Sequence, residues 1–195
     1  MLSSPRRNRL AALLLICLPP LLLAASATQL LDSAGHPLAH FPEPGTRILV
    51  LVFGATDCPI SNRYVPEVDR LAKEFSPRHV DIRWVFPNPD DTPEVVRNHI
   101  ADFSIATPSI LDPQQELVKQ AGVFVTPEAA VFAVDGPNLR ELYHGRLDDR
   151  YIAFGRERPQ ANHHELQEAI VAALAGKPAP QPGGSPVGCS IVPRT

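Results

Sequence analysis

The sequence predicts an α/β fold in which a mixed central sheet is flanked by helices on both faces. Three observations predict it. An apolar, β-branched run at 47–53 is typical of a strand buried on both faces. Helix and strand patterns then alternate, from 60–75 through 79–86 to 90–103. Two further strand patterns lie on either side of a turn at 135–138, which adds antiparallel strands to parallel ones.

The first 27 residues are typical of a secretory signal peptide. Arginines within 6–9 precede an apolar run at 10–25, and small residues at 25–27 suit cleavage. An uncleaved membrane anchor is the alternative, but Pro19-Pro20 and the modest apolar length argue against a stable spanning helix. We therefore expect a signal peptide at 1–27 and an exported protein, periplasmic or extracellular, with no stable membrane span after cleavage.

The rest of the chain is expected to form one domain at 28–176, followed by a Pro/Gly-rich tail at 177–195. Residues 28–46 show little periodicity and contain one expected edge strand near 29–32. Beyond Gly176 the periodicity ends, so we expect the tail to be extended or mobile.

Within the domain, apolar residues at helical spacing predict a long helix at 60–75. Pro59 suits its first turn, and Pro66 is expected to kink it. Alternating apolar residues predict the strand at 79–86. The remaining elements are a short helix, the two strands of a hairpin and a final helix: 114–121, 128–134, 139–143 and 163–175.

The second helix has a clear start signal at Asp90-Asp91-Thr92-Pro93-Glu94. The signal combines an acidic N-cap, a proline in the first turn and a carboxylate near the positive end of the helix dipole. The helix is expected to end near Phe103, and a loop around Pro108 follows.

Composition and motifs exclude several functions. A formal net charge of -3 and a pI near 6.1 provide no basic patch, so no nucleic-acid partner is expected. His163-His164 are adjacent and do not share a helix face, while His99 and His144 lack ligand spacing. We therefore expect no metal and no cofactor.

Cysteine chemistry is the strongest functional signal. Cys17 leaves with the signal peptide, so Cys58 and Cys189 remain, a pair that can form a disulfide in an oxidising compartment. Cys58 lies between the buried strand and the long helix, where backbone N–H groups stabilise a thiolate, although Asp57 opposes this. A buried structural cysteine is the alternative. The position favours a nucleophile for thiol–disulfide exchange or peroxide reduction.

Thr126-Pro127 is the second candidate feature, directly before a predicted strand. X–Pro bonds are the ones that adopt the cis form readily, and a cis proline facing Cys58 would present a backbone edge to a partner peptide or substrate. An ordinary trans proline at a strand start is the alternative.

Four separated segments carry a more specific pattern. They are Phe53-Gly-Ala-Thr-Asp-Cys-Pro-Ile-Ser-Asn-Arg-Tyr64, Gly122-Val-Phe-Val-Thr-Pro-Glu128, Tyr143-His-Gly-Arg-Leu-Asp-Asp-Arg-Tyr151 and Gly188-Cys-Ser-Ile191. Together they resemble an exported branch of the redoxin superfamily, which groups alkyl hydroperoxide reductase/thiol-specific antioxidant proteins with thioredoxin-like proteins. The resemblance spans about 47–191. It implies a thioredoxin-like fold, with Cys58 at the redox position and Pro127 at the cis-proline position.

The chain departs from two active-site patterns of that superfamily. Ser61 stands where a dithiol motif has its second cysteine, and Ala55 and Leu51 stand where peroxiredoxins have threonine and proline. A Cys-x-x-Ser site can attack a disulfide, but it needs another thiol to resolve the mixed disulfide. Cys189 is the candidate resolving thiol; the alternatives are a free tail thiol or pairing with another molecule.

Three functions therefore stay open. The first is an exported thiol–disulfide oxidoreductase in which Cys58 attacks, Cys189 resolves, and Thr126 and Pro127 shape the surface that binds protein thiols or disulfides. The second is a thiol peroxidase, an antioxidant enzyme that uses Cys58 on peroxide. The third is a non-catalytic binding module with a structural Cys58–Cys189 bridge.

Overall fold

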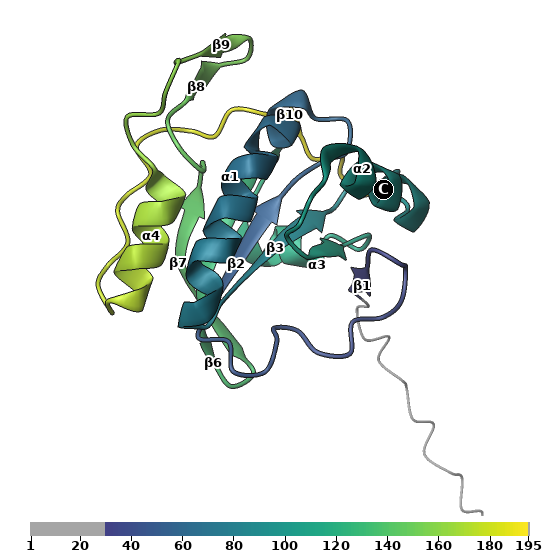
Figure 1. Cartoon of the computed structure of the whole chain (residues 1–195), viewed down its shortest axis with the longest axis horizontal. Coiled ribbons are helices and arrows are strands. Elements are labelled where there is room, and N and C mark those ends of the chain that lie inside the picture. Colours follow the sequence, from purple (N-terminus) through teal and green to yellow (C-terminus); the bar gives the residue numbers. More distant parts are fainter. Residues whose placement is uncertain (1–29, 195) are drawn as a thin grey trace, which may run out of the picture.

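A six-stranded mixed sheet forms the centre of the protein, in the order β1-β4-β3-β2-β6-β7 (Figure 1). The computed structural model describes residues 30–194, so the predicted signal peptide at 1–27 lies outside the described residues. The strands of the sheet are β1 (Leu31–Asp32), β2 (Ile48–Phe53), β3 (Val80–Phe86), β4 (Ser109–Leu111), β6 (Glu128–Asp135) and β7 (Asn138–Gly145).

Strand β2 lies in the middle of this sheet and explains its mixed character. It pairs in parallel with β3 and antiparallel with β6. All six of its residues are buried, which confirms the prediction that its apolar run is covered on both faces. The parallel pairing continues from β3 to β4, while β1 and β7 close the two edges antiparallel.

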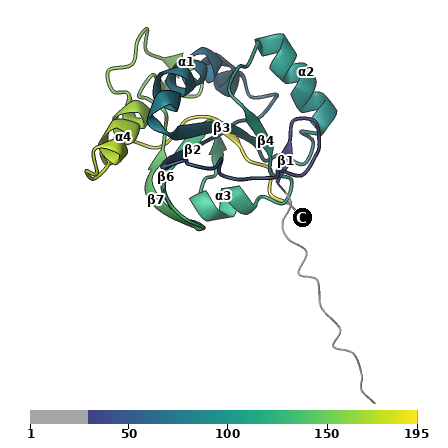
Figure 2. The same ribbon diagram turned by 60° about the horizontal axis from the view of Figure 1, so that its bottom comes forward.

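Helices cover both faces of the sheet (Figure 2). The helices are α1 (Pro59–Phe75), α2 (Pro93–Phe103), α3 (Glu116–Ala121) and α4 (Glu165–Leu174), with a 3-10 turn at Ser76–Arg78. Helices α1, α2 and α4 contribute to one hydrophobic cluster, whereas α3 packs into a second cluster on the opposite face. The predicted α/β fold with helices on both faces is therefore confirmed.

Several local predictions differ from the structure. The region after Pro108, predicted as a loop, contains β4, because three buried residues there complete the parallel pairing with β3. The N-cap of α2 is Thr92 rather than an acidic residue, and its hydroxyl oxygen accepts a hydrogen bond from the N–H of Val95 at 3.3 Å. Helix α1 continues across Pro66 as one helix. The small hairpin β8 (Tyr151–Ala153) and β9 (Arg156–Glu157) has no counterpart in the predicted elements.

The C-terminal tail is extended, but it is paired with the domain. After α4 it returns across the end of the sheet where β2 ends and α1 begins (Figure 1). There β10 (Cys189–Ser190) forms a two-stranded sheet with β5 (Val125–Thr126). Among residues 30–194, the structure contains no helix long and apolar enough to cross a membrane.

Candidate functional site

Cys58 is the N-cap residue of α1 and is fully buried, with a relative exposure of 0%. The turn at 54–57 links it to the end of β2, and its N–H donates to the carbonyl of Ala55 at 3.1 Å. Its side chain makes no capping hydrogen bond to the helix. The thiol is therefore placed at the positive end of the α1 dipole and is not engaged as a cap.

The Thr126-Pro127 peptide bond is cis, which decides between the two alternatives left open by the sequence and agrees with what the family resemblance implied. The carbonyl oxygen of Thr126 accepts a hydrogen bond from the Cys58 thiol, with a sulfur–oxygen distance of 3.1 Å. Because this contact joins residues 68 positions apart, the fold brings the predicted cis-proline loop directly against the predicted redox position.

Cys189 lies on the other side of the same loop. In the β5–β10 pair its Cα faces Thr126, whose hydroxyl donates to the Cys189 carbonyl at 3.4 Å. Cys58 and Cys189 are both free thiols. All four residues singled out in the sequence, Cys58, Cys189, Thr126 and Pro127, therefore meet at one place in the fold.

The two thiols have opposite electrostatic environments. Burial tends to raise the pKa of Cys58, but hydrogen bonds from the thiol of Cys189, the hydroxyl and N–H of Ser61 and the Thr126 side chain outweigh it, so this pKa falls below its usual value. Burial, the neighbouring Cys58 and the charge of Asp57 raise the pKa of Cys189 to about 12. A thiolate therefore forms more readily on Cys58 than on Cys189, whose thiol can donate a hydrogen bond to it.

Ser61 lies one helical turn after Cys58 and is 2% exposed. Its hydroxyl makes no hydrogen bond of ordinary geometry to the neutral thiol, yet it lies close enough to donate to a thiolate. The serine that replaces the second cysteine of a dithiol motif thus keeps a donor beside the sulfur.

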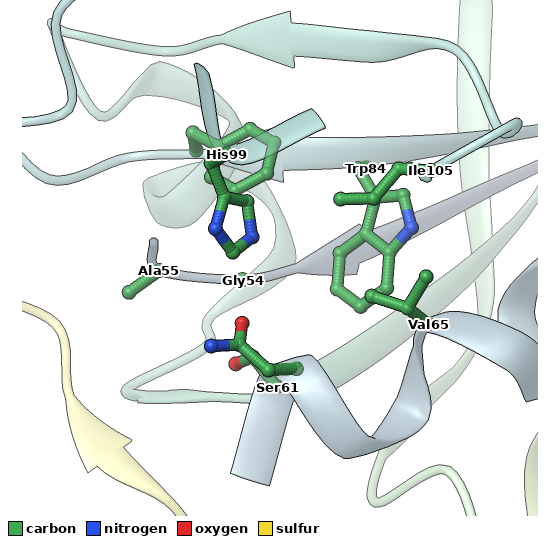
Figure 3. A pocket seen from close by; sticks show the side chains of 9 residues that line it. Gly54, Ala55, Ser61, Val65, Trp84, His99 and Ile105 are labelled. Atoms are coloured by element: carbon green, nitrogen blue, oxygen red, sulfur yellow. The ribbon is translucent and has the colours of Figure 1, made fainter. Parts of the chain in front are cut away.

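A narrow crevice lies behind Ser61, between α1, α2 and β3. Figure 3 shows Ser61 and His99 on opposite sides of it, with Trp84 along one wall. Three buried polar atoms here have no partner: the hydroxyl oxygen of Ser61, Oδ1 of Asn62 and Nε1 of Trp84. Burial lowers the pKa of His99 and so favours its neutral ring, although the charge of Asp102 acts in the opposite direction.

Sequence reasoning missed the residues that seat the tail. Gly188 lies so close to the Thr126 carbonyl that a side chain would collide with it. Gln115 donates from Nε2 to the carbonyl of Val192 at 2.5 Å and accepts at Oε1 from the N–H of Arg194 at 3.0 Å. A lone glutamine at a helix start carries no sequence signal for such a role, and Gly188 stands out in the sequence only as part of the Gly188-Cys-Ser-Ile191 segment.

In the described part of the chain, no three or more His, Cys, Asp or Glu side chains are grouped so that they could hold a metal ion. The site therefore consists of two thiols, a cis-proline loop and a buried serine. Such a set of groups can carry thiol–disulfide chemistry.

Similar solved structures of other proteins identify the fold of this chain. An uncharacterised conserved protein from Geobacillus kaustophilus is 24% identical with a TM-score of 0.68, over 85% of this chain and 88% of that one. A hypothetical protein from Sinorhizobium meliloti is 22% identical with a TM-score of 0.68, over 84% and 88% of the two chains. A thioredoxin-like protein from Aeropyrum pernix is 18% identical with a TM-score of 0.51, over 76% and 88%. The fold is therefore thioredoxin-like.

A search among curated proteins finds no significant match. The sequence does match the family model described as Redoxin over residues 29–151. That match covers more than half of the chain and includes Cys58, Thr126 and Pro127, while the tail that carries Cys189 lies beyond it. The protein is therefore a member of the Redoxin family with a thioredoxin-like fold.

Proposed function

We propose that this protein is an exported thiol–disulfide oxidoreductase in which Cys58 is the attacking thiolate and Cys189 the resolving thiol. One observation carries the proposal: the strand that holds Cys189 pairs with Thr126, and the carbonyl of Thr126 accepts the hydrogen bond of the Cys58 thiol. Two thiols that are distant in sequence thus lie against the same residue, Thr126. The opposite pKa shifts of Cys58 and Cys189 give each thiol a distinct role.

The reaction begins with a disulfide in a partner protein. The Cys58 thiolate attacks one sulfur of that disulfide, which forms a mixed disulfide and releases the other partner sulfur as a thiolate. Cys189 then loses its proton to the released thiolate and attacks the Cys58 sulfur. The partner leaves with two reduced thiols, and the chain keeps a Cys58–Cys189 disulfide. Run in reverse, the same steps oxidise a dithiol partner.

The N-terminal pattern at 1–27, which lies outside the described residues, supports the proposed export. In a periplasmic or extracellular compartment, disulfides persist and protein thiols or disulfides are available as partners. No cofactor is needed for the exchange, because electrons move between sulfur atoms.

The test is thiol–disulfide exchange on a scrambled or disulfide-bonded model protein. We expect Cys58→Ser to abolish exchange and Cys189→Ser to trap a mixed disulfide with the partner, because the first thiol is then free to attack but has no resolving neighbour. Ser190→Ala, on the exposed side of the same short strand, is the matched control and should retain exchange.

Two results would overturn the proposal. One is exchange that is unchanged in Cys58→Ser. The other is rapid peroxide consumption with a sulfenic acid trapped on Cys58 and no exchange on protein disulfides, which would assign the thiol to the peroxidase class instead.

A further inference from the structure

The C-terminal tail occupies the free edge of the cis-proline loop as an added strand. Cys189 and Ser190 pair antiparallel with Thr126 and Val125. The ladder continues beyond them, since the N–H of Ile191 donates to the carbonyl of Phe124 at 3.0 Å. The backbone edge nearest Cys58 is thus filled by the chain itself.

The register of this strand is fixed on its C-terminal side. Ile191 is 8% exposed and packs into the hydrophobic cluster that lies on the α3 face of the sheet. The N–H of Val192 donates to Oδ1 of Asn88 at 3.2 Å, and the carbonyl of Val192 accepts from Gln115 at 2.5 Å. A slip by one residue would take Ile191 out of its apolar site and break these bonds.

On the N-terminal side, the edge leaves no room for a side chain. A Cβ on Gly188 would lie 2.0 Å from the carbonyl oxygen of Thr126, 2.6 Å from its carbonyl carbon and 3.1 Å from the nitrogen of Pro127. All three are backbone atoms, so no change of rotamer relieves the collision. The same Thr126 oxygen accepts the hydrogen bond of the Cys58 thiol, so moving this carbonyl would also disturb the nucleophile.

We propose that the backbone of Thr126 and Pro127 acts as a specificity filter that admits, in this register, only a cysteine preceded by glycine, so that Gly188-Cys189 of the chain itself is the preferred thiol to meet Cys58. A cysteine of another polypeptide that follows a larger residue must sit in a different register, farther from Cys58. The redox consequence rests on the proposed function, whereas the docking of the tail does not.

The filter acts on the resolving step. With oxidised glutathione as the disulfide, Cys58 attacks one glutathione sulfur, forms a Cys58–glutathione mixed disulfide and releases one glutathione thiolate. Cys189 then gives its proton to the solvent or a thiolate, attacks the Cys58 sulfur and releases the second glutathione. Gly188 keeps Cys189 in line for this second attack, and the strand that it allows to dock also covers Cys58.

The test compares Gly188→Ala with Gly184→Ala in the purified full chain. Gly184 lies on the same tail, but a Cβ there would meet only the flexible guanidinium end of Arg146, at 2.8 Å. In a Cys189→Ser background, iodoacetamide labelling of Cys58 is followed by peptide mass spectrometry, which reads it separately from Cys17. With Cys189 present, oxidised glutathione is added and peptide mass spectrometry follows the mixed disulfide on Cys58. Circular dichroism melting checks that each variant is folded.

We expect Gly188→Ala to label at Cys58 about tenfold faster or more, and to resolve the mixed disulfide about tenfold more slowly or more, because the tail strand is displaced. Gly184→Ala should behave as the parent chain does. Equal labelling rates in the two folded alanine variants would overturn the filter. If labelling differs but no variant forms a mixed disulfide with glutathione, the filter stands and the oxidoreductase function fails.

Discussion

The chemistry of Cys58 depends on which groups donate hydrogen bonds to its sulfur. Burial alone would raise its pKa, and the structure opposes this with donors from Ser61, Thr126 and Cys189. Of these, Ser61 is the donor that has no other partner in the described residues. The serine is therefore the side chain through which the reactivity of Cys58 can be tested with the least structural damage.

We expect Ser61→Ala to raise the pKa of Cys58, because the thiolate loses a donor that the neutral thiol does not use. Thiolate absorbance near 240 nm, followed against pH in a Cys189→Ser background, measures it. Ser190→Ala, on the exposed side of β10, is the control. A titration that Ser61→Ala leaves unmoved, or moves downward, contradicts this assignment.

His99 is buried in the crevice behind Ser61 and links pH to stability. Burial lowers its pKa from an ordinary value of 6.5, so as pH falls the unfolded chain binds a proton before the folded chain does. Protonation of this side chain therefore costs stability below the ordinary pKa.

We expect the parent protein to lose stability relative to His99→Gln as pH falls from about 7 to about 5. Urea unfolding at a series of pH values measures the difference, and exposed His40→Gln is the control. If the parent and His99→Gln lose stability in parallel over this range, burial of His99 has no such effect.

At the scale of single residues, the sequence predicts the site only partly. Cys58 and Pro127 stand next to strand and helix signals, so local pattern is enough to single them out. Trp84 and His99 look like an ordinary strand residue and a lone histidine, because their common crevice depends on how α2 packs over β3. Gly188 is significant only once the tail is seated on Thr126.

The elements that hold the site differ in how they gain stability. Strand β2 and helix α1 are long and carry their own apolar patterns, so their bounds were predicted closely. Strands β5 and β10 have two residues each and exist because they pair with one another. No local pattern in the sequence can predict such short strands, since their hydrogen bonds come from a partner more than sixty positions away.

The anchor of β10 is Gln115, which precedes α3 in a left-handed backbone conformation with φ of 58°. Its amide binds the carbonyls of Pro87 and Val192 and the N–H of Arg194. One side chain therefore connects the segment after β3, the start of α3 and the end of the tail.

We expect Gln115→Asn to release the end of the tail, because asparagine tolerates the left-handed conformation but is one carbon too short for these contacts. The loss of stability should be about 1 kcal/mol. Hydrogen exchange of the amides of Cys189 and Ile191 should become faster. Gln114→Asn at the exposed neighbour is the control, and equal exchange in both variants would contradict the anchor.

At the scale of the whole molecule, local sequence patterns predict the fold of the domain but not the course of the tail. Alternating strand and helix patterns predict the mixed sheet with helices on both faces, and the structure and its thioredoxin-like neighbours confirm it. Beyond Gly176 the sequence has no periodicity, so it predicts an extended or mobile tail. The course of the tail across the end of the sheet beside Cys58 depends on contacts with β5, Gln115 and Asn88, which no local pattern shows. These contacts place a second thiol, that of Cys189, beside the cis-proline loop.

The reduction potential of the Cys58–Cys189 pair tests this assignment most directly. The purified chain is equilibrated in glutathione buffers of graded ratio, and the bridged form is quantified by intact mass after acid quenching and alkylation. We expect a single intramolecular disulfide with a potential above about −300 mV, within reach of protein partners. A pair that never bridges, or one that stays oxidised well below that potential as a structural staple, would contradict a redox role for Cys58 and Cys189.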